Sequence, residues 1–301
     1  MSNGLANRRL VRVADDGGTV RLAVVDGDQL GILDADDMVA TLQVGSLPAV
    51  TEHVPIADAE TLTPDGPWRV LVPVVAPETW AAGVTYERSR EARRAESLGR
   101  DVYDLIYDAV RPELFLKDAA GRRTVGPGAS IAVRSDAVWS VPEPELAVVL
   151  DAGARPLALT IGNDVSSRDI EGANPLYLPQ AKIYARACAL GPALLVPADW
   201  EADYEIELRI LDAGGETLFE DRTSTDRMRR PLAVLTEFLR RDNPVAAGSV
   251  LLTGTGIVPP DDVTLAPGLS VDIRIPGIGV LRNPVAPATE PNHSQEAIID
   301  V

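Results

Sequence analysis

The chain has 301 residues, 46% of them apolar and 24% charged, so it can bury one large core or two smaller ones, and its composition excludes wholesale disorder. Its 28 basic and 45 acidic residues give a formal net charge of −17, which repels a phosphate backbone, so we expect no nucleic acid partner. The apolar runs are far shorter than the roughly 18 residues of a membrane span, so we expect no membrane segment.

No long apolar stretch follows Arg8 and Arg9, so we expect no secretory signal. The only cysteine, Cys188, cannot form an internal disulfide, which favours a cytoplasmic protein. With two histidines in the whole chain, a Ser-His-Asp triad or a histidine-rich metal site is improbable.

Short strands are predicted in the first part of the chain. Three apolar runs are separated by Asp-Gly turn signals at Asp16-Gly17 and Asp26-Gly27. These predicted strands cover residues 10–13, 20–25 and 30–33. We expect a short helix near residues 36–44. The character of the sequence changes at residues 70–75, so we predict a small N-terminal α/β domain, residues 1–75, followed by a larger domain, residues 76–301.

Strand signals dominate most of the larger domain. Residues 86–110 have a helical composition, and a second helix is predicted from Asp226 to Arg241, with Ser224 or Thr225 as its N-cap. Strands are predicted over residues 114–116, 130–133, 146–150, 157–161 and 204–211. Because strands outnumber helices and do not alternate with them, we expect an α+β, β-rich fold with mixed, mostly antiparallel sheets.

Two carboxylates at the start of a predicted strand are the first sign of chemistry. In an extended chain Glu143 and Glu145 point to the same side, and the apolar run 146–150 follows at once. Such carboxylates repel each other unless a cation lies between them, and oxygen ligands suit Mg²⁺ or Mn²⁺. The alternative is a solvated acidic start to the strand.

Three further segments carry candidate groups. Asp164 follows a buried strand, where it could complete a metal site or cap a turn. Lys117 and Lys182 are the only lysines beside 26 arginines, which suggests sites that need an ammonium able to lose its proton. The run Thr253-Gly254-Thr255-Gly256 could hold a carboxylate or form a tight turn, and it is no phosphate-binding P-loop.

Together, the motifs Glu143-Pro144-Glu145, Gly162–Arg168, Lys182, Gly191-Pro192, Thr253–Gly256 and Pro276–Asn283 resemble the fumarylacetoacetate hydrolase superfamily over about residues 78–285. The resemblance implies a mixed β-sandwich roll as the catalytic domain, homodimers or homotetramers, and Mg²⁺ or Mn²⁺ held by Glu143, Glu145 and Asp164. It also places Lys117 and Lys182 at the site.

The chain departs from the hydrolases of that superfamily at one position. Their motif Gly-x-Asn-Tyr-x-x-His carries a water-activating histidine, whereas Ser89 stands there in this chain. The segment instead resembles the branch that dehydrates 2-keto-3-deoxy sugar acids, which implies a lyase acting on a small 2-keto acid. We expect Lys182 and Glu113 to act as acid/base, and Arg88, Ser89, Lys117 and Thr255 to bind the substrate. The alternative is a Mg²⁺-dependent hydrolase or decarboxylase of acylpyruvates.

Overall fold

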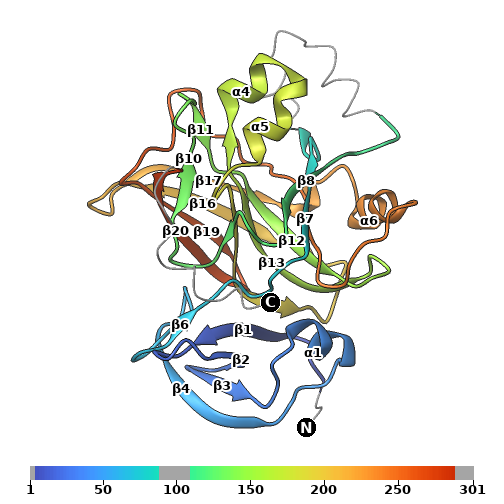
Figure 1. The fold of residues 1–301 in the computed structure, drawn as a ribbon, viewed down its shortest axis with the longest axis vertical. Helices are drawn as coiled ribbons and strands as arrows, with labels where there is room; N and C mark the ends of the chain where they lie inside the picture. Colours follow the sequence, from blue (N-terminus) through green and yellow to red (C-terminus); the bar gives the residue numbers. More distant parts are fainter. Residues whose placement is uncertain (1–3, 88–108, 289–301) are drawn as a thin grey trace.

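The computed structural model describes residues 4–87 and 109–288, and strands prevail throughout those ranges. They form a 13-stranded sheet, a five-stranded sheet and a two-stranded ribbon. Most neighbouring strands are antiparallel, and three pairs are parallel. The β-rich, mixed fold predicted from the sequence is therefore confirmed. Figure 1 shows a small body built from the first strands lying below a larger one.

The small body is an antiparallel meander closed by a helix. Its strands are β1 (Arg8–Ala14), β2 (Val20–Asp26), β3 (Gln29–Leu33), β4 (Val50–Asp58), β5 (Thr63–Pro64) and β6 (Arg69–Val70). Helix α1 (Met38–Val44) begins after Asp37, whose side chain accepts a hydrogen bond from the amide of Ala40, and ends at Gly45. The three predicted strands and the predicted helix of this part all form.

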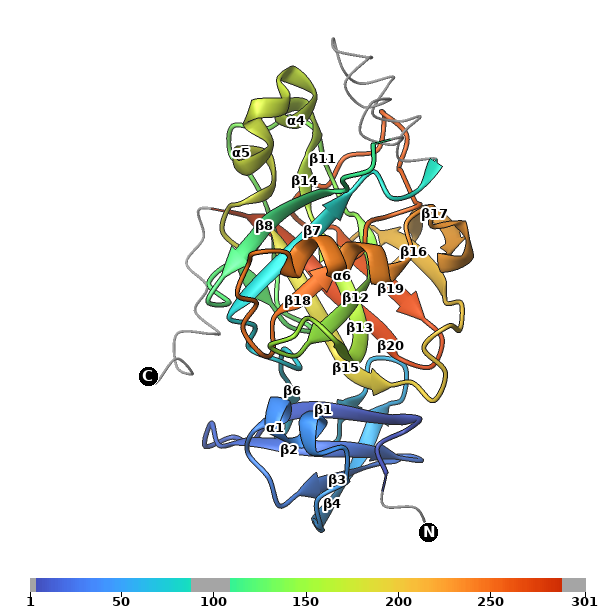
Figure 2. The same cartoon turned by 90° about the vertical axis from the view of Figure 1, so that its right-hand side faces the viewer.

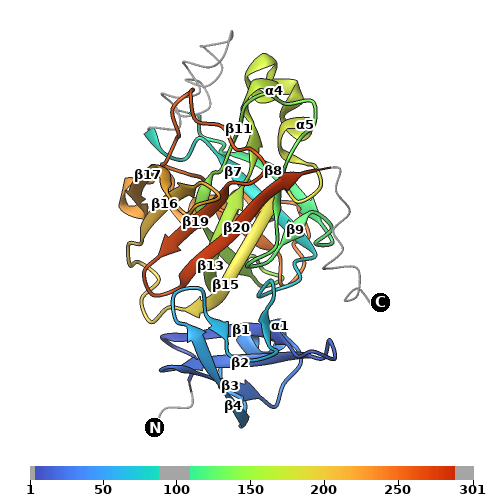
Figure 3. The ribbon, with the colours of Figure 1, turned by 90° about the vertical axis from the view of Figure 1, so that its left-hand side faces the viewer.

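The two bodies share one sheet. Strand β1 pairs with β15 (Cys188–Val196), so the meander extends the large sheet. Side chains of β1, β2 and α1 also pack in one apolar cluster with side chains of β15 and its neighbours. Figure 3 shows β15 running down toward β1. The predicted division at residues 75 and 76 falls in the connection between β6 and β7, and as a domain boundary it stays a prediction.

The centre of the large sheet is buried on both faces. Its strand order is β15-β13-β12-β18-β7-β8, with β9 beside β15. The bounds are β7 (Glu78–Gly83), β8 (Glu113–Ala119), β9 (Thr124–Val125), β12 (Pro144–Leu150), β13 (Pro156–Asp164) and β18 (Val250–Leu252). Along β12, Leu146 and Val148 pack in one cluster, whereas Ala147 and Val149 pack in the other. This burial explains why β12 reads as an unbroken apolar run.

The five-stranded sheet covers one face of the large sheet. Its order is β10-β20-β19-β16-β17, and its inner side chains share an apolar cluster with Leu146 and Val148. The bounds are β10 (Ile131–Val133), β16 (Glu205–Leu211), β17 (Thr217–Ser224), β19 (Ser270–Ile275) and β20 (Gly279–Pro287). Helix α6 (Leu232–Arg240) adds Leu235 and Leu239 to this cluster. Figure 2 shows α6 beside the strands of both sheets.

Two short helices follow β13 and project from one end of the large body. They are α4 (Arg168–Ala173) and α5 (Leu178–Lys182), joined by the 3-10 turn η1 (Pro175–Tyr177). The ribbon of β11 (Ser140–Val141) and β14 (Ser166–Ser167) leads into them. Strand β11 comes just before β12 and β14 comes just after β13, so this ribbon adjoins the point where β12 begins and β13 ends.

One expectation about secondary structure was wrong. The helix predicted from Asp226 begins only at Leu232, after a 3-10 turn η2 (Thr225–Arg227), because Pro231 lacks an amide hydrogen and disfavours a helical residue before it. Most of the helix predicted over 86–110 lies outside the described residues. No described helix has the length and apolarity needed to cross a membrane.

Asn283 provides a test of how the two sheets are joined. It is buried on β20, and its side-chain amide donates to the carbonyl oxygens of Gly126 and Ala129 at 2.9 and 2.8 Å. We predict that Asn283→Ala lowers the free energy of unfolding by about 1–3 kcal/mol, because two carbonyl groups lose their donor. Asn243→Ala, which removes one bond to Leu239 at a half-buried helix end, should cost less. Urea denaturation of both variants at equal protein concentration measures this, and equal losses would contradict it.

Candidate active site

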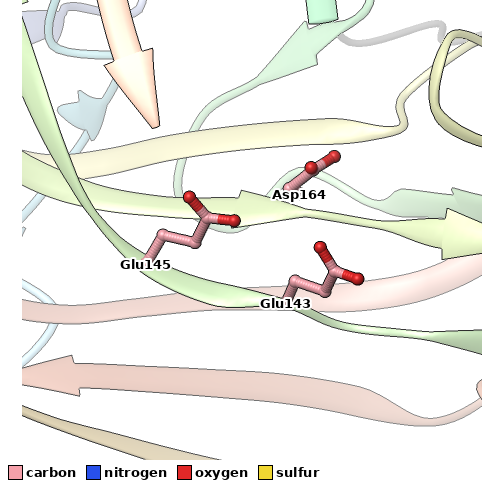
Figure 4. Close-up of side chains that lie close together, drawn as sticks. All are labelled: Glu143, Glu145 and Asp164. Carbon is pink, nitrogen blue, oxygen red and sulfur yellow. The ribbon is translucent and has the colours of Figure 1, made fainter. Parts of the chain in front are cut away.

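Three carboxylates converge at the end of the large sheet. Strands β12 and β13 pair antiparallel with Glu145 opposite Gly162, so the start of one strand lies beside the end of the other. The amide of Asp164 donates to the carbonyl oxygen of Glu143 at 3.0 Å, which continues this pairing. The alternation of side chains then places Glu143, Glu145 and Asp164 on the same face. Figure 4 shows the three side chains lying close together.

The geometry of these three side chains fits a divalent cation. One carboxylate oxygen from each lies within 4.8 Å of the others, and all three residues are buried. An all-oxygen, triply charged donor set suits Mg²⁺ or Mn²⁺ rather than a softer metal. Burial first, and then the charges of Asp164 and Glu143, raise the pKa of Glu145 well above its ordinary value. The centre thus concentrates negative charge that a cation would relieve.

Positive side chains already surround the three carboxylates. Lys182, at the end of α5, places its Nζ 2.5 Å from Glu143 Oε2 and 3.1 Å from Asp164 Oδ2. Arg168, at the start of α4, places a guanidinium nitrogen 3.0 Å from Glu143 Oε1. Since all of these groups are buried, their attraction is screened less by water than that of a surface pair.

Lys117 holds the site from within the protein. Its ammonium lies 2.5 Å from Asp164 Oδ1 and donates to the carbonyl oxygens of Val165 and Lys182 at 2.9 and 2.6 Å. These contacts use the three donors of an ammonium, and they fix Asp164 relative to the end of α5. Lys117 is not among the described residues that line the cavity, and its predicted contact with substrate stays a prediction.

Gly254 holds the third carboxylate through its backbone. Its amide donates to Glu145 Oε2 at 2.5 Å, and its φ is +94°, a conformation that other residues rarely adopt. A Cβ there would come within 2.0 Å of the Thr85 hydroxyl oxygen, which donates to the carbonyl of Thr253. The run from Thr253 to Gly256 therefore brings its backbone close to the acidic centre.

A cavity opens beside the carboxylates. Its described lining residues are Ala82, Gly83, Val84, Glu113, Phe115, Glu143, Glu145, Asp164, Arg168, Glu171, Lys182, Gly254 and Thr255. Glu113 lies across Gly83, where a Cβ would come within 2.2 Å of its carboxylate oxygen. The Phe115 ring centre is 5.9 Å from the Lys182 ammonium.

The structure brings most of the predicted site residues together. Lys182, Glu113, Thr255 and the three acidic residues line one cavity, whereas Arg88 and Ser89 lie outside the described residues. Sequence reasoning assigned no role to Arg168, Phe115 or Glu171. Arg168 does close the Gly162–Arg168 motif, and Glu171 stands three residues later, a spacing that puts both on one face of a helix. That spacing was the sequence feature from which Arg168 and Glu171 could have been predicted to lie together at the site.

Comparisons with known proteins point to one family. The family model for the fumarylacetoacetate hydrolase C-terminal region matches residues 78–286. A probable 2-keto-3-deoxyxylonate dehydratase of Haloferax volcanii is 43% identical, covering 93% of this chain and 96% of the relative. The 2-dehydro-3-deoxy-D-arabinonate dehydratase of Saccharolobus solfataricus is 40% identical, covering 92% and 96%.

A solved structure adds a ligand to this picture. A 2-keto-3-deoxy-D-arabinonate dehydratase complexed with magnesium and 2,5-dioxopentanoate superposes with a TM-score of 0.81 and is 38% identical, covering 93% of this chain and 99% of that one. That relative combines a magnesium ion with a keto acid.

The acidic centre leads to a prediction about metal binding. We predict that Glu145→Gln weakens Mn²⁺ binding by roughly tenfold or more, because an amide replaces one of three buried charges. The loss of the free Mn²⁺ resonance in electron paramagnetic titrations measures the affinity. Glu237→Gln, the same change on the exposed side of α6, is the control and should bind as the wild type does. An unchanged affinity in Glu145→Gln would contradict the assignment.

Proposed function

The chain belongs to the fumarylacetoacetate hydrolase family, and from that premise we propose that it is a metal-dependent hydro-lyase that dehydrates a 2-keto-3-deoxy-pentonate to 2,5-dioxopentanoate. The observation that carries this proposal is the pairing of the buried carboxylates Glu143, Glu145 and Asp164 with a small cavity, in a chain 38% identical to a dehydratase that binds magnesium and 2,5-dioxopentanoate.

The cation belongs at the three carboxylates. Held there by Glu143, Glu145 and Asp164, Mg²⁺ or Mn²⁺ would act as a Lewis acid toward the carboxylate and keto oxygens of a 2-keto acid. Arg168 and the Gly254 amide support this arrangement, since each holds one carboxylate oxygen in place. Lys117 does the same for Asp164.

The protein must move protons along the remaining three carbons. A proton leaves C3, the C4 hydroxyl departs as water, and hydrogen shifts from C5 into the chain, which leaves an aldehyde at C5. We assign Lys182 and Glu113 as acid/base groups because both line the cavity, Lys182 beside the acidic centre and Glu113 on β8. Thr255 lines the same cavity and stays a predicted substrate contact. Arg88 and Ser89 stay predicted substrate contacts.

Assembly and location belong to the same proposal. Large apolar side chains are exposed at Val138 and Leu176, to 84% and 83%, which supports a homodimer or homotetramer that covers such groups. Cys188 is buried, and burial raises the pKa of its thiol to about 12, so it is an inert thiol suited to the cytoplasm.

The reaction type can be tested directly. We predict that the protein with Mg²⁺ converts a 2-keto-3-deoxy-pentonate to 2,5-dioxopentanoate and cleaves acylpyruvates slowly, because the chain has a serine where the related hydrolases have a histidine. Parallel assays of both substrate classes, with products identified by mass spectrometry, measure this, and excess chelator should abolish turnover. If acylpyruvate cleavage to pyruvate is clearly faster, the protein is a hydrolase.

Lys182 provides a second test. We predict that Lys182→Arg loses about 100-fold or more in kcat, because a guanidinium stays protonated at working pH and cannot serve as a base. The variant keeps a positive charge beside Glu143, so its thermal unfolding and Mn²⁺ binding should stay close to those of the wild type. A kcat near the wild-type value would reduce Lys182 to an electrostatic role.

A further inference from the structure

The peptide between Thr253 and Gly254 is held at both of its polar ends. Its amide donates to Glu145 Oε2 at 2.5 Å, and its carbonyl oxygen accepts from the hydroxyl of Thr85 at 2.8 Å. One chain of hydrogen bonds therefore runs from the Thr85 hydroxyl, through a single peptide, to the Glu145 carboxylate. Thr85 is fully buried and is not among the described residues that line the cavity, so it reaches the site through this peptide.

Polarisation couples the two ends of this chain. When the carbonyl oxygen of a peptide accepts a hydrogen bond, the peptide becomes more polar and its N–H becomes a stronger donor. Glu145 in its ionised, metal-binding form is an acceptor of the kind that makes short and strong hydrogen bonds. The Thr85 hydroxyl thus strengthens the bond that orients Glu145.

The glycines of the Thr253–Gly256 run make room for two consecutive side chains that follow β7. A Cβ on Gly254 would overlap the hydroxyl oxygen of Thr85, and a Cβ on Gly256 would come within 2.6 Å of the ring of Tyr86. Any residue larger than glycine at these two positions would displace Thr85 or Tyr86. The small residues of the run are therefore explained by this packing.

Thr85 is also fixed from its own side. Its carbonyl oxygen accepts from the amide of Arg229 at 3.0 Å, and Tyr86 forms an isolated β-bridge with Met228. Val84, just before it, has a φ of +50°, which a β-branched residue rarely adopts. Such a conformation persists only where the surrounding structure determines it, and it is concentrated at functional sites. The chain keeps this unfavourable bend in the segment that presents the Thr85 hydroxyl.

Thr253 is tied to the residue next to Glu145. Its amide and its hydroxyl both donate to the carbonyl oxygen of Leu146, at 3.1 and 2.8 Å. With Thr253 fixed on β12, the following peptide can move only by rotating about the backbone bonds that flank it. The hydrogen bonds to Thr85 and to Glu145 oppose that rotation, one at each end of the peptide.

We propose that Thr85 is the positioning residue for the metal ligand Glu145: through the Thr253–Gly254 peptide, its hydroxyl holds the Glu145 carboxylate in the orientation that binds the cation. This inference rests on the metal site of the proposed function. Without the hydroxyl the peptide rotates, and Glu145, which lies beside two other carboxylates, turns away from them. The cation must then reorient Glu145 when it binds, so its affinity falls.

Thr85→Val tests this role in metal binding, because it exchanges the hydroxyl for a methyl group of similar size. The Mn²⁺ affinity, measured by electron paramagnetic titration, should fall about tenfold, as is typical when a residue that orients a metal ligand is lost. Thr85→Ser keeps the hydroxyl and should bind Mn²⁺ within about twofold of the wild type. Should Thr85→Val not fold, Thr85→Ala removes the same hydroxyl, and the same loss is expected.

Thr79→Val is the matched control. Thr79 lies on β7, is as buried as Thr85, and its hydroxyl has no hydrogen-bond partner within the part of the chain that the structure describes. The same substitution therefore removes no bond there, and the Mn²⁺ affinity should equal that of the wild type. All titrations are run below the thermal unfolding transition of each variant, so that a loss of stability alone does not change the measured affinity.

Nuclear magnetic resonance of the metal-free protein observes the peptide itself. Threonine precedes glycine at two places in the chain, Thr253-Gly254 and Thr255-Gly256. Labelling the carbonyl carbons of threonine with ¹³C and the nitrogens of glycine with ¹⁵N therefore selects these two glycine amides. Thr255→Ser removes the second pair and so identifies the resonance of Gly254.

The amide proton of Gly254 should move upfield in Thr85→Val, because its hydrogen bond to Glu145 weakens, and should keep its position in Thr79→Val. The assignment is overturned if Thr85→Val binds Mn²⁺ as the wild type does, if Thr79→Val weakens binding equally, or if the Gly254 resonance does not move.

Failure of the proposed function gives a different result. A wild type that binds Mn²⁺, with its variants in the expected order, without dehydrating a 2-keto-3-deoxy-pentonate refutes the proposed reaction and leaves Thr85 as assigned. A wild type that binds no Mn²⁺ overturns the metal site and, with it, the role of Thr85.

Discussion

The antiparallel pairing of β12 with β13 is the constraint on which the site depends. Its register brings the start of one strand to the end of the other and sets Glu143, Glu145 and Asp164 on one face. A shift by one residue would turn Glu145 to the opposite face, because side chains alternate along a strand. The register is secured by apolar side chains on both faces of β12, so the core of the protein and the geometry of its acidic centre depend on the same pairing.

Three buried carboxylates close together are unstable unless opposite charges accompany them. The chain supplies Lys117, Lys182 and Arg168, which equal the three negative charges in number. Removing one member of such a buried set costs about 3–5 kcal/mol, so these residues matter to the fold as well as to the reaction. The raised pKa of Glu145 is the remaining sign of repulsion. A bound divalent cation would relieve that repulsion, which links the metal to the stability of the site.

The elements around the acidic centre divide the cavity between two tasks. Strand β8 and the Thr253–Gly256 run form one wall, with Glu113, Phe115 and Thr255, whereas α4 supplies Arg168 and Glu171. In our proposal the centre binds the keto acid end, and Lys182 and Glu113 move protons. The β-rich framework keeps these groups on strands and on short helices anchored to them, so each has a defined position.

Local pattern was enough for the fold class and for much of the site. Apolar runs and Asp-Gly turns predicted β1, β2 and β3, and the Glu143-Pro144-Glu145 spacing placed two carboxylates on one side because a strand has a period of two residues. The motifs also identified the family to which the chain belongs. Helix α6, by contrast, begins only after Pro231, where backbone chemistry overrides the apolar spacing.

Only the tertiary structure decided which distant side chains meet. Lys117 and Lys182 stand 65 positions apart in the chain, yet the ammonium of one donates to the carbonyl oxygen of the other. Glu171 has no motif of its own, and its place in the cavity follows from Ser166 and from the turn of α4 over the end of β13. Such contacts join elements across sheets and helices, and their geometry comes from long-range packing, which no local pattern of residues encodes.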